Sequence, residues 1–215
     1  MPQDINDAHH FAAGRRPASV THFALRRTVD PVDQAVSLEA IKCFLRLPAD
    51  DDDNDVMLEQ LIGAATNYVE VLLGRALITQ TWEYKLDYFP FEFQLPRPPA
   101  ISVTSIAYVD TDGASQTLAT SVYQTDFSSE PGRISLDDGQ TWPSTLTGEL
   151  NAVTVTYTAG YGTDTTDVPA NIQTAIMFLV QDYYDNPQGQ LIGTIAKDNP
   201  VVMRLLGIDR QPRFF

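Results

Sequence analysis

The residues LEQLIGAATNYVEVLLGRALITQTWEYKLDY, at positions 58–88, decide the fold class because their hydrophobic period changes partway along. Up to Leu72 the apolar residues recur every three or four positions, as on a helix, and Gly74 stands where a C-terminal cap belongs. From Trp82 onward apolar and polar residues alternate, which is typical of a half-buried strand. The apolar positions are Leu58, Leu61, Ile62, Ala65, Val69 and Leu72 in the helix, and Trp82, Tyr84, Leu86 and Tyr88 in the strand.

Two further helical patterns flank this stretch. In SLEAIKCFLRLP (37–48), Ser37 is a good N-cap and Pro48 ends the run. In DVPANIQTAIMFLVQDYYDN (167–186), Asp167 is placed to cap the helix and Pro169 lies near its first position. The apolar stripe of this second helix consists of Ile172, Ala175, Ile176, Leu179, Val180 and Tyr183. We therefore expect a helical core built from residues 37–76 and 167–186.

Residues 77–160 have the pattern of an antiparallel sheet module. A change of parity after Val103 predicts a bulge near Ser105, and Asp112–Gly113 predicts a hairpin turn. Further short strands are expected around 115–118, 122–127 and 132–136 and in NAVTVTYTAG, at 151–160. The predicted fold class is α+β: a small helical bundle of two N-terminal helices plus a C-terminal helix, with an inserted antiparallel β module and extended terminal arms.

The two ends of the chain lack a sustained hydrophobic period. Residues 1–36 carry scattered charges and include Pro17 and Pro31, and we expect them to form a flexible arm. Residues 187–215 are expected to form a loop, a short helical turn in PVVMRLLG and a tail.

Composition limits the classes of function. Lys and Arg total 14 and Asp and Glu total 28, a formal charge of −14, which argues against a general binder of the phosphate backbone. Cys43 is the single cysteine, so an internal disulfide or a Cys-based zinc site is excluded and an intracellular origin is favoured. We expect no membrane span and no signal peptide, because long apolar runs are missing.

Motifs for catalysis and metal binding are missing from the sequence. The acidic run 50–55 begins like a calcium loop, but Val56 and Ile62 occupy the positions that require Gly and Glu. We interpret the run as a solvated helix N-terminus. Gly160 and Gly162 are expected in a short loop between strand and helix rather than in a phosphate cradle. The three histidines, His9, His10 and His22, all lie in the expected arm. We expect no cofactor, no metal and no enzymatic activity.

Four stretches in a fixed order resemble one family. They are SLEAIKCFLRL with LIGAATNYVEVLLGRALITQTWEYKL, then LPRPPAISVTSIAYVDTDG, then YQTDFSSEPGRISLDDGQTWP, then NAVTVTYTAGYGTDTTDVPANIQTAIMFLVQDYYDN. Together they are similar to the phage head-tail connector (head completion adaptor) proteins of long-tailed phages, prophages and gene transfer agents, over roughly residues 37–187. The arm before Ser37 is longer than expected for that family.

The resemblance implies a structural subunit of the virion, at the interface of head and tail. Such a homo-oligomer, expected to be a dodecameric ring, would assemble in the bacterial host cytoplasm and lie beneath the portal protein. It would extend the DNA channel and hold a tail or stopper (tail-completion) protein. DNA would pass without specific binding, because an acidic wall repels phosphates.

The resemblance also implies contact residues. The segment 201–215 would reach the portal, unless it packs on its own domain, and deleting it is expected to abolish docking but spare the fold. The portal-contact candidates are Met203, Arg204, Leu205, Leu206, Arg210, Arg213, Phe214 and Phe215. The helices are expected to pack within each subunit and against neighbouring subunits, and the interface candidates are Leu58, Leu61, Ile62, Ile172, Ile176, Leu179 and Tyr183.

Two other functions rest on side chains of the sheet module. A carbohydrate- or peptide-binding module of a phage tail or surface protein would need exposed aromatic residues on one concave surface, although aromatics at strand positions usually belong to a core. An enzyme would need two carboxylates in a buried, coupled pair. The aromatic candidates are Trp82, Tyr84, Tyr88, Phe91 and Phe93, and the acidic ones are Glu83, Asp87, Asp126 and Glu130.

Overall fold

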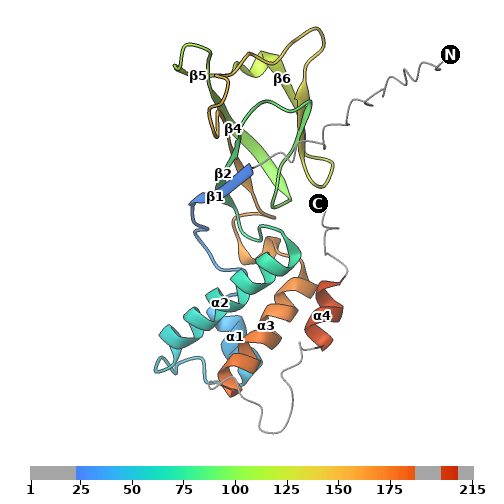
Figure 1. The fold of residues 1–215 in the computed structure, drawn as a ribbon. Coiled ribbons are helices and arrows are strands. Elements are labelled where there is room, and N and C mark those ends of the chain that lie inside the picture. The colour runs from blue at the N-terminus through green and yellow to red at the C-terminus, as the bar shows by residue number, and fades with distance from the viewer. Residues whose placement is uncertain (1–22, 187–199, 208–215) are drawn as a thin grey trace, which may run out of the picture.

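The computed structural model describes residues 23–186 and 200–207, which form a helical body and a β module lying end to end (Figure 1). The helical body contains α1 (Leu38–Leu45), α2 (Asp55–Leu73), α3 (Ala170–Asp185) and α4 (Pro200–Leu206). Strands β2 to β8 of the β module are inserted between α2 and α3, whereas β1 joins it from the segment before α1, and its strand pairs are antiparallel. This architecture confirms the predicted α+β class.

The strands of the β module form two sheets within the described residues. The larger sheet has the order β1-β2-β8-β4-β5, and the smaller has the order β3-β7-β6. The larger contains β1 (Phe23–Val29), β2 (Gln80–Leu86), β4 (Ala100–Val109), β5 (Ser115–Thr117) and β8 (Val153–Ala159). The smaller contains β3 (Glu92–Gln94), β6 (Tyr123–Asp126) and β7 (Arg133–Leu136). Two short 3-10 helices, η1 (Thr120–Val122) and η2 (Thr165–Asp167), complete the described elements.

The predicted caps of α1 and α2 are confirmed, whereas the predicted cap of α3 is not. The Ser37 hydroxyl accepts the N–H of Ala40 at 3.2 Å, which caps α1, and Gly74 ends α2 with a φ of 70°. The expected capping of α3 by Asp167 is wrong, because Asp167 lies one turn earlier in η2 and its carboxylate accepts the N–H of Asp164 at 3.1 Å. Pro169 occupies the N-cap position of α3 instead.

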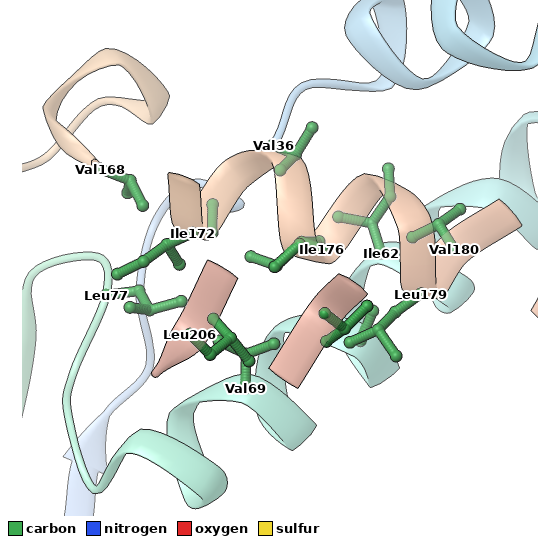
Figure 2. Close-up of a cluster of buried hydrophobic side chains, with 14 of the residues drawn as sticks. Val36, Ile62, Val69, Leu77, Val168, Ile172, Ile176, Leu179, Val180 and Leu206 are labelled. Atoms are coloured by element: carbon green, nitrogen blue, oxygen red, sulfur yellow. The ribbon is translucent and has the colours of Figure 1, made fainter. Parts of the chain in front are cut away.

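One apolar cluster holds the helical body together (Figure 2). It joins the buried stripes of α2 and α3 to residues from the segment before α1, from the start of the β module and from α4. Figure 2 shows Ile62, Val69, Ile176 and Leu206 around the centre of this cluster. Because α2 and α3 meet here, the segment between them must leave and return at one end of the bundle, which makes the β module an insertion.

Strand β1 corrects the expectation of a flexible arm over residues 1–36. It pairs with β2 from Phe23 opposite Leu86 to Arg27 opposite Trp82, and a register shift follows before Val29. Nearly all of its residues are exposed, so backbone pairing along an edge holds the strand and no apolar alternation marks it in the sequence. Residues 1–22 lie outside the described residues.

The predicted bulge and turn of the long strand β4 are confirmed. Its pairing with β8 shifts register between Val103 and Ser105. In the hairpin to β5, Gly113 has a φ of 82°, and the Asp110 carboxylate accepts the N–H of Ala114 at 2.9 Å. The side-chain amide of Gln116 and the backbone N–H groups of the turn, with that of Ala114 first, lower the pKa of Asp110. An ionised side chain therefore holds the turn.

A buried polar cluster connects α2 to the β module, and we call Arg27, Glu70, Gln80 and Arg97 the Glu70 cluster. Glu70 Oε1 accepts the backbone N–H of Leu77 at 2.9 Å and the side-chain amide of Gln80 at 2.7 Å. Arg27 donates to Gln80 Oε1 at 3.1 Å, and its Nη1 lies 3.7 Å from Glu70 Oε2. Arg97 donates to the backbone carbonyl of Glu70 at 2.8 Å. Segments from β1, β2 and the loop before β4 thus converge on one helical residue.

The loop after β8 makes a second connection between the two parts. Tyr161 donates its N–H to the carbonyl of Leu77, and Thr79 donates its N–H to the carbonyl of Gly162, both at 2.9 Å. Gly160 has a φ of 144°, and a Cβ there would lie 2.5 Å from the backbone nitrogen of Thr79. Gly160 therefore allows close approach of two backbones, and both Gly160 and Gly162 lie between strand and helix as expected.

We predict that Glu70→Ala lowers the free energy of unfolding by about 3 kcal/mol, because buried donors on Leu77 and Gln80 lose their acceptor. Glu70→Gln keeps one acceptor oxygen and should lose about 1 kcal/mol. Urea unfolding followed by circular dichroism measures both. Glu59→Ala, at an exposed position of the same helix, is the control and should stay within about 0.5 kcal/mol of wild type. Equal losses at positions 59 and 70 would contradict the role of the cluster.

We predict that Gly160→Ala destabilises the chain by about 2 kcal/mol or more, since both the positive φ and the neighbouring backbone oppose a Cβ. Gly63→Ala is the matched control, because a Cβ at this helical position meets nothing within 4 Å. It should stabilise the chain by about 0.5–1 kcal/mol through helix propensity. Thermal unfolding of the two variants tests the contrast, and a stable Gly160→Ala protein would refute the close-approach argument.

Candidate functional site

The predicted subunit-interface residues lie mainly inside the subunit. Leu58, Ile62, Ile172 and Ile176 are fully buried in the helical cluster, and Leu179 is nearly so. Their apolar surface is already used within one chain. The half-buried members, Leu61 and Tyr183, retain surface for a neighbour. Contact of these helices with neighbouring subunits stays a prediction.

Four portal-contact candidates lie in α4, which packs beside α3 (Figure 1). Leu206 is buried in the helical cluster together with Val202, whereas Arg204 is exposed. Asn171 of α3 donates its side-chain amide to the carbonyl of Leu205 at 3.2 Å. Met203 and Leu205 are half-buried. This part of the tail therefore packs on its own domain, which is the alternative that the sequence left open.

The packing of α4 changes the interpretation of a C-terminal deletion. Removing residues 201–215 would take Val202 and Leu206 out of the core, so the expectation that this deletion spares the fold is wrong. The remaining candidates, Arg210, Arg213, Phe214 and Phe215, lie outside the described residues, as do the three histidines.

The aromatic residues of the β module do not form one exposed binding face. Trp82 is buried, and the guanidinium of Arg97 lies 5.5 Å from its ring centroid. Phe93 is fully buried, and the half-buried Tyr84 packs edge-on against Phe23. Of the five candidates only Tyr88 and Phe91 are exposed, and both follow β2 in a loop. The concave aromatic surface required for a sugar or peptide site is not formed.

The four acidic candidates have separate structural partners. Backbone N–H donation from Ser128, with the guanidinium of Arg133, lowers the pKa of Asp126, which is the opposite of what a general acid needs. Among residues 23–186 and 200–207, no three His, Cys, Asp or Glu side chains gather as metal ligands. The partners are Arg26 and Lys85 for Glu83, the N–H of Asn151 for Asp87, Arg133 for Asp126 and Arg75 for Glu130.

The acidic run before α2 is tied to α1. Lys42 Nζ lies 2.6 Å from a carboxylate oxygen of Asp55 and 3.7 Å from one of Asp52. The hydrogen bond from Asp55 is the main cause that raises the pKa of Lys42, so this lysine stays charged. Asp55 is also the first residue of α2, where a carboxylate complements the helix dipole. The run therefore fixes the start of α2 against α1.

No helix in the described part of the chain is long and apolar enough to cross a membrane. The described surface does carry exposed apolar residues, among them Met57, Tyr68 and Val71 of α2. Surfaces for protein contact are therefore the candidate functional sites of this molecule.

Comparison with known proteins agrees with this view. The model of a family described as "head completion protein" matches residues 34–191, which include α1 to α3 of the helical body and β2 to β8 of the β module. A chain from the neck of an empty gene transfer agent (GTA) particle, solved with C6 symmetry, superposes with a TM-score of 0.73. It shares 24% sequence identity, and the match covers 89% of this chain and 97% of that one.

Two further solved structures are similar. A chain from the virion of a native GTA particle has a TM-score of 0.72 at 24% identity, with 89% of this chain and 97% of that chain covered. One from the neck of a native particle with C12 symmetry has a TM-score of 0.62 at 24% identity, covering 87% and 97%. These matches support the fold over most of the chain. No curated protein sequence matches the chain.

We predict that Leu206→Ala lowers the free energy of unfolding by about 2–4 kcal/mol, because Leu206 is buried in the helical cluster. Val201→Ala, one turn earlier at an exposed position of α4, should change it by less than about 0.5 kcal/mol. Chemical unfolding of both variants makes the comparison. A neutral Leu206→Ala would show that α4 is not part of the folded core in solution.

Proposed function

The chain belongs to the head completion protein family, and we propose that it is a structural head-tail connector subunit that joins a DNA-filled head to its tail. The observation that carries this proposal is the family match over residues 34–191, since it includes elements of both parts of the fold rather than of one. The similarity to chains in the neck and virion of GTA particles supports the same location. The protein would then act at the head-tail interface after assembly in the host cytoplasm.

The proposed assembly is a homo-oligomeric ring, with a dodecamer as the expected form. A closed ring requires a head-to-tail contact in which two different surfaces of each copy meet. The similar neck structures were solved with C6 and C12 symmetry, which supports a cyclic arrangement for those chains and, by likeness, for this one. The portal protein would lie on one side of the ring and a tail or stopper protein on the other.

The charge of the chain suits a DNA channel. Each copy carries a formal charge of −14, so a ring concentrates negative charge around its axis. Phosphates near such a wall are repelled rather than retained, and DNA moves through without specific binding. The described carboxylates that were candidates for catalysis serve in ion pairs or turns, so we assign the chain a structural role with no catalytic step.

We further propose that portal docking uses the end of the chain beyond the core-packed part of α4. Arg204 is exposed on α4, and Arg210, Arg213, Phe214 and Phe215 follow it in the sequence. Basic and aromatic side chains together suit an acidic, partly apolar partner surface. A cut after Gly207 separates docking from folding, because it leaves Val202 and Leu206 in the core.

We predict that cells producing the particles without this chain accumulate DNA-filled heads that lack tails, as counted by electron microscopy. The wild-type gene should restore tailed particles, whereas a chain ending at Gly207 should not, although it folds with an unchanged melting temperature. Arg204→Glu is expected to weaken docking, because it reverses an exposed positive charge that precedes the docking segment in the sequence. Arg46→Glu, a charge reversal at an exposed arginine that follows α1, is the matched control.

The outcomes separate two claims. Normal tailed particles in the absence of the chain would refute the connector role. Full rescue by the chain ending at Gly207 would keep the connector role but refute the docking segment.

A further inference from the structure

Helix α2 has a second apolar stripe that faces solvent. Met57, Leu61, Ala64, Tyr68 and Val71 follow one another at alternating spacings of four and three residues. Met57, Tyr68 and Val71 are 42%, 39% and 55% exposed, Ala64 is also exposed, and Leu61 is half-buried. We call these five residues the outer stripe. It runs beside the buried stripe that faces α3 and extends over most of the helix.

The spacing of the outer stripe matches what a partner helix or another packed surface requires. Alternating steps of four and three residues keep side chains on one narrow seam, as in helices that pack through knobs and holes. Nothing within the described part of the chain covers this seam, since its members remain exposed or half-buried. A stripe with this regularity on a surface helix is unusual for a face that only meets water.

The outer stripe lies on a face without charge. From Gln60 to Gly74 the sequence of α2 contains one charged residue, Glu70, and its side chain is buried in the Glu70 cluster. The exposed polar residues of this stretch, Gln60 and Asn67, are neutral. In a chain with 28 acidic residues, four helical turns free of exposed charge form a distinct surface. Depletion of charge is the compositional mark of the centre of a protein interface.

A hollow of about 360 Å³ lies on another side of α2, between residues 30–34 and the 63–70 part of the helix, and its lining includes the charged residues Arg27, Asp30 and Asp33. Gly63 forms part of its wall, and a Cβ there would meet nothing within 4 Å, so a partner side chain has room. Two buried side-chain oxygens at the hollow, Gln34 Oε1 and Thr66 Oγ1, have no hydrogen-bond partner within the described residues. A polar group from outside can satisfy them.

We propose that the outer stripe of α2 is one side of the contact between two copies of this chain. This inference rests on the proposed ring. The charge of the chain indicates which partner binds this stripe. Two copies that each carry a formal charge of −14 repel one another wherever their acidic surfaces meet. They can pack closely only through a face that carries no charge of its own. In a closed ring the contact is head-to-tail, so the stripe meets a different surface of the next copy.

The position of Tyr183 agrees with this assignment. Burial, then the nearby Tyr68 and Asp182, raise the pKa of Tyr183, so Tyr183 lies within electrostatic reach of Tyr68 on α2. Leu61 and Tyr183, which are the half-buried members of the predicted interface set, therefore belong to or border the outer stripe. The fully buried members of that set are replaced by Met57, Ala64, Tyr68 and Val71 as the residues that meet a neighbour.

The test measures self-association of the full-length protein by sedimentation velocity over a range of concentrations. Ala64→Glu and Tyr68→Glu each add a charge to the stripe, and we expect each to weaken self-association at least about tenfold. Phe91→Glu is the matched control, because Phe91 is 90% exposed in a loop of the β module and receives the same change. It should associate like wild type. Melting temperatures check that every variant folds.

Each outcome decides the assignment. Loss of association in both stripe variants, with the control unchanged, supports it. Stripe variants that associate like wild type overturn it, and so does a wild-type protein that sediments as a monomer up to its highest soluble concentration. Failure of the connector role is recognised separately, by tailed particles that form without the chain. The α2 contact and the proposed function can therefore fail independently.

Discussion

The buried carboxylate of Glu70 is the constraint on which the arrangement of the two parts depends. An ionised group removed from water is tolerated only where donors surround it, and here the donors come from β1, β2 and the segment after α2. Arg97, from the loop before β4, adds a bond to the backbone of the same residue. Only one orientation of the β module supplies all of these partners together. The cluster therefore converts an insertion between two helices into a unit of defined shape, as a ring subunit requires.

Helix α2 contains Glu70 and also has two apolar stripes. Its inner stripe, with Leu58, Ile62 and Val69, fills the cluster shared with α3 and α4. The outer stripe leaves a neutral face on the other side. Folding and the proposed assembly thus use two adjacent stripes of the same nineteen-residue helix. Leu61 belongs to both surfaces, because it is half-buried against the inner cluster, whereas substitutions at the exposed Ala64 and Tyr68 are expected to leave the core intact.

The features that local sequence determines were predicted, and those that depend on distant partners were not. Caps such as Ser37 and Gly74, the bulge near Ser105 and the hairpin at Gly113 follow from residues close in sequence. Strand β1 could not be predicted, because its exposed residues carry no alternation and its pairing partner lies more than fifty residues away. The division into two sheets and the Glu70 cluster are non-local in the same way. Periodicity also cannot say which of two adjacent stripes faces inward, which is why buried leucines and isoleucines were predicted as interface residues.

Charge relates the proposed assembly to the proposed passage of DNA. The same acidic surface that repels phosphates also opposes the approach of a second copy, so attraction must come from the neutral face of α2. Salt then acts on the two processes in opposite directions. Screening over about 10 Å at 0.1 M salt weakens the repulsion between copies and favours the ring. DNA binding through basic residues would instead weaken with salt because it depends on counterion release. A connector of this composition gains stability under conditions in which adventitious DNA binding is lost.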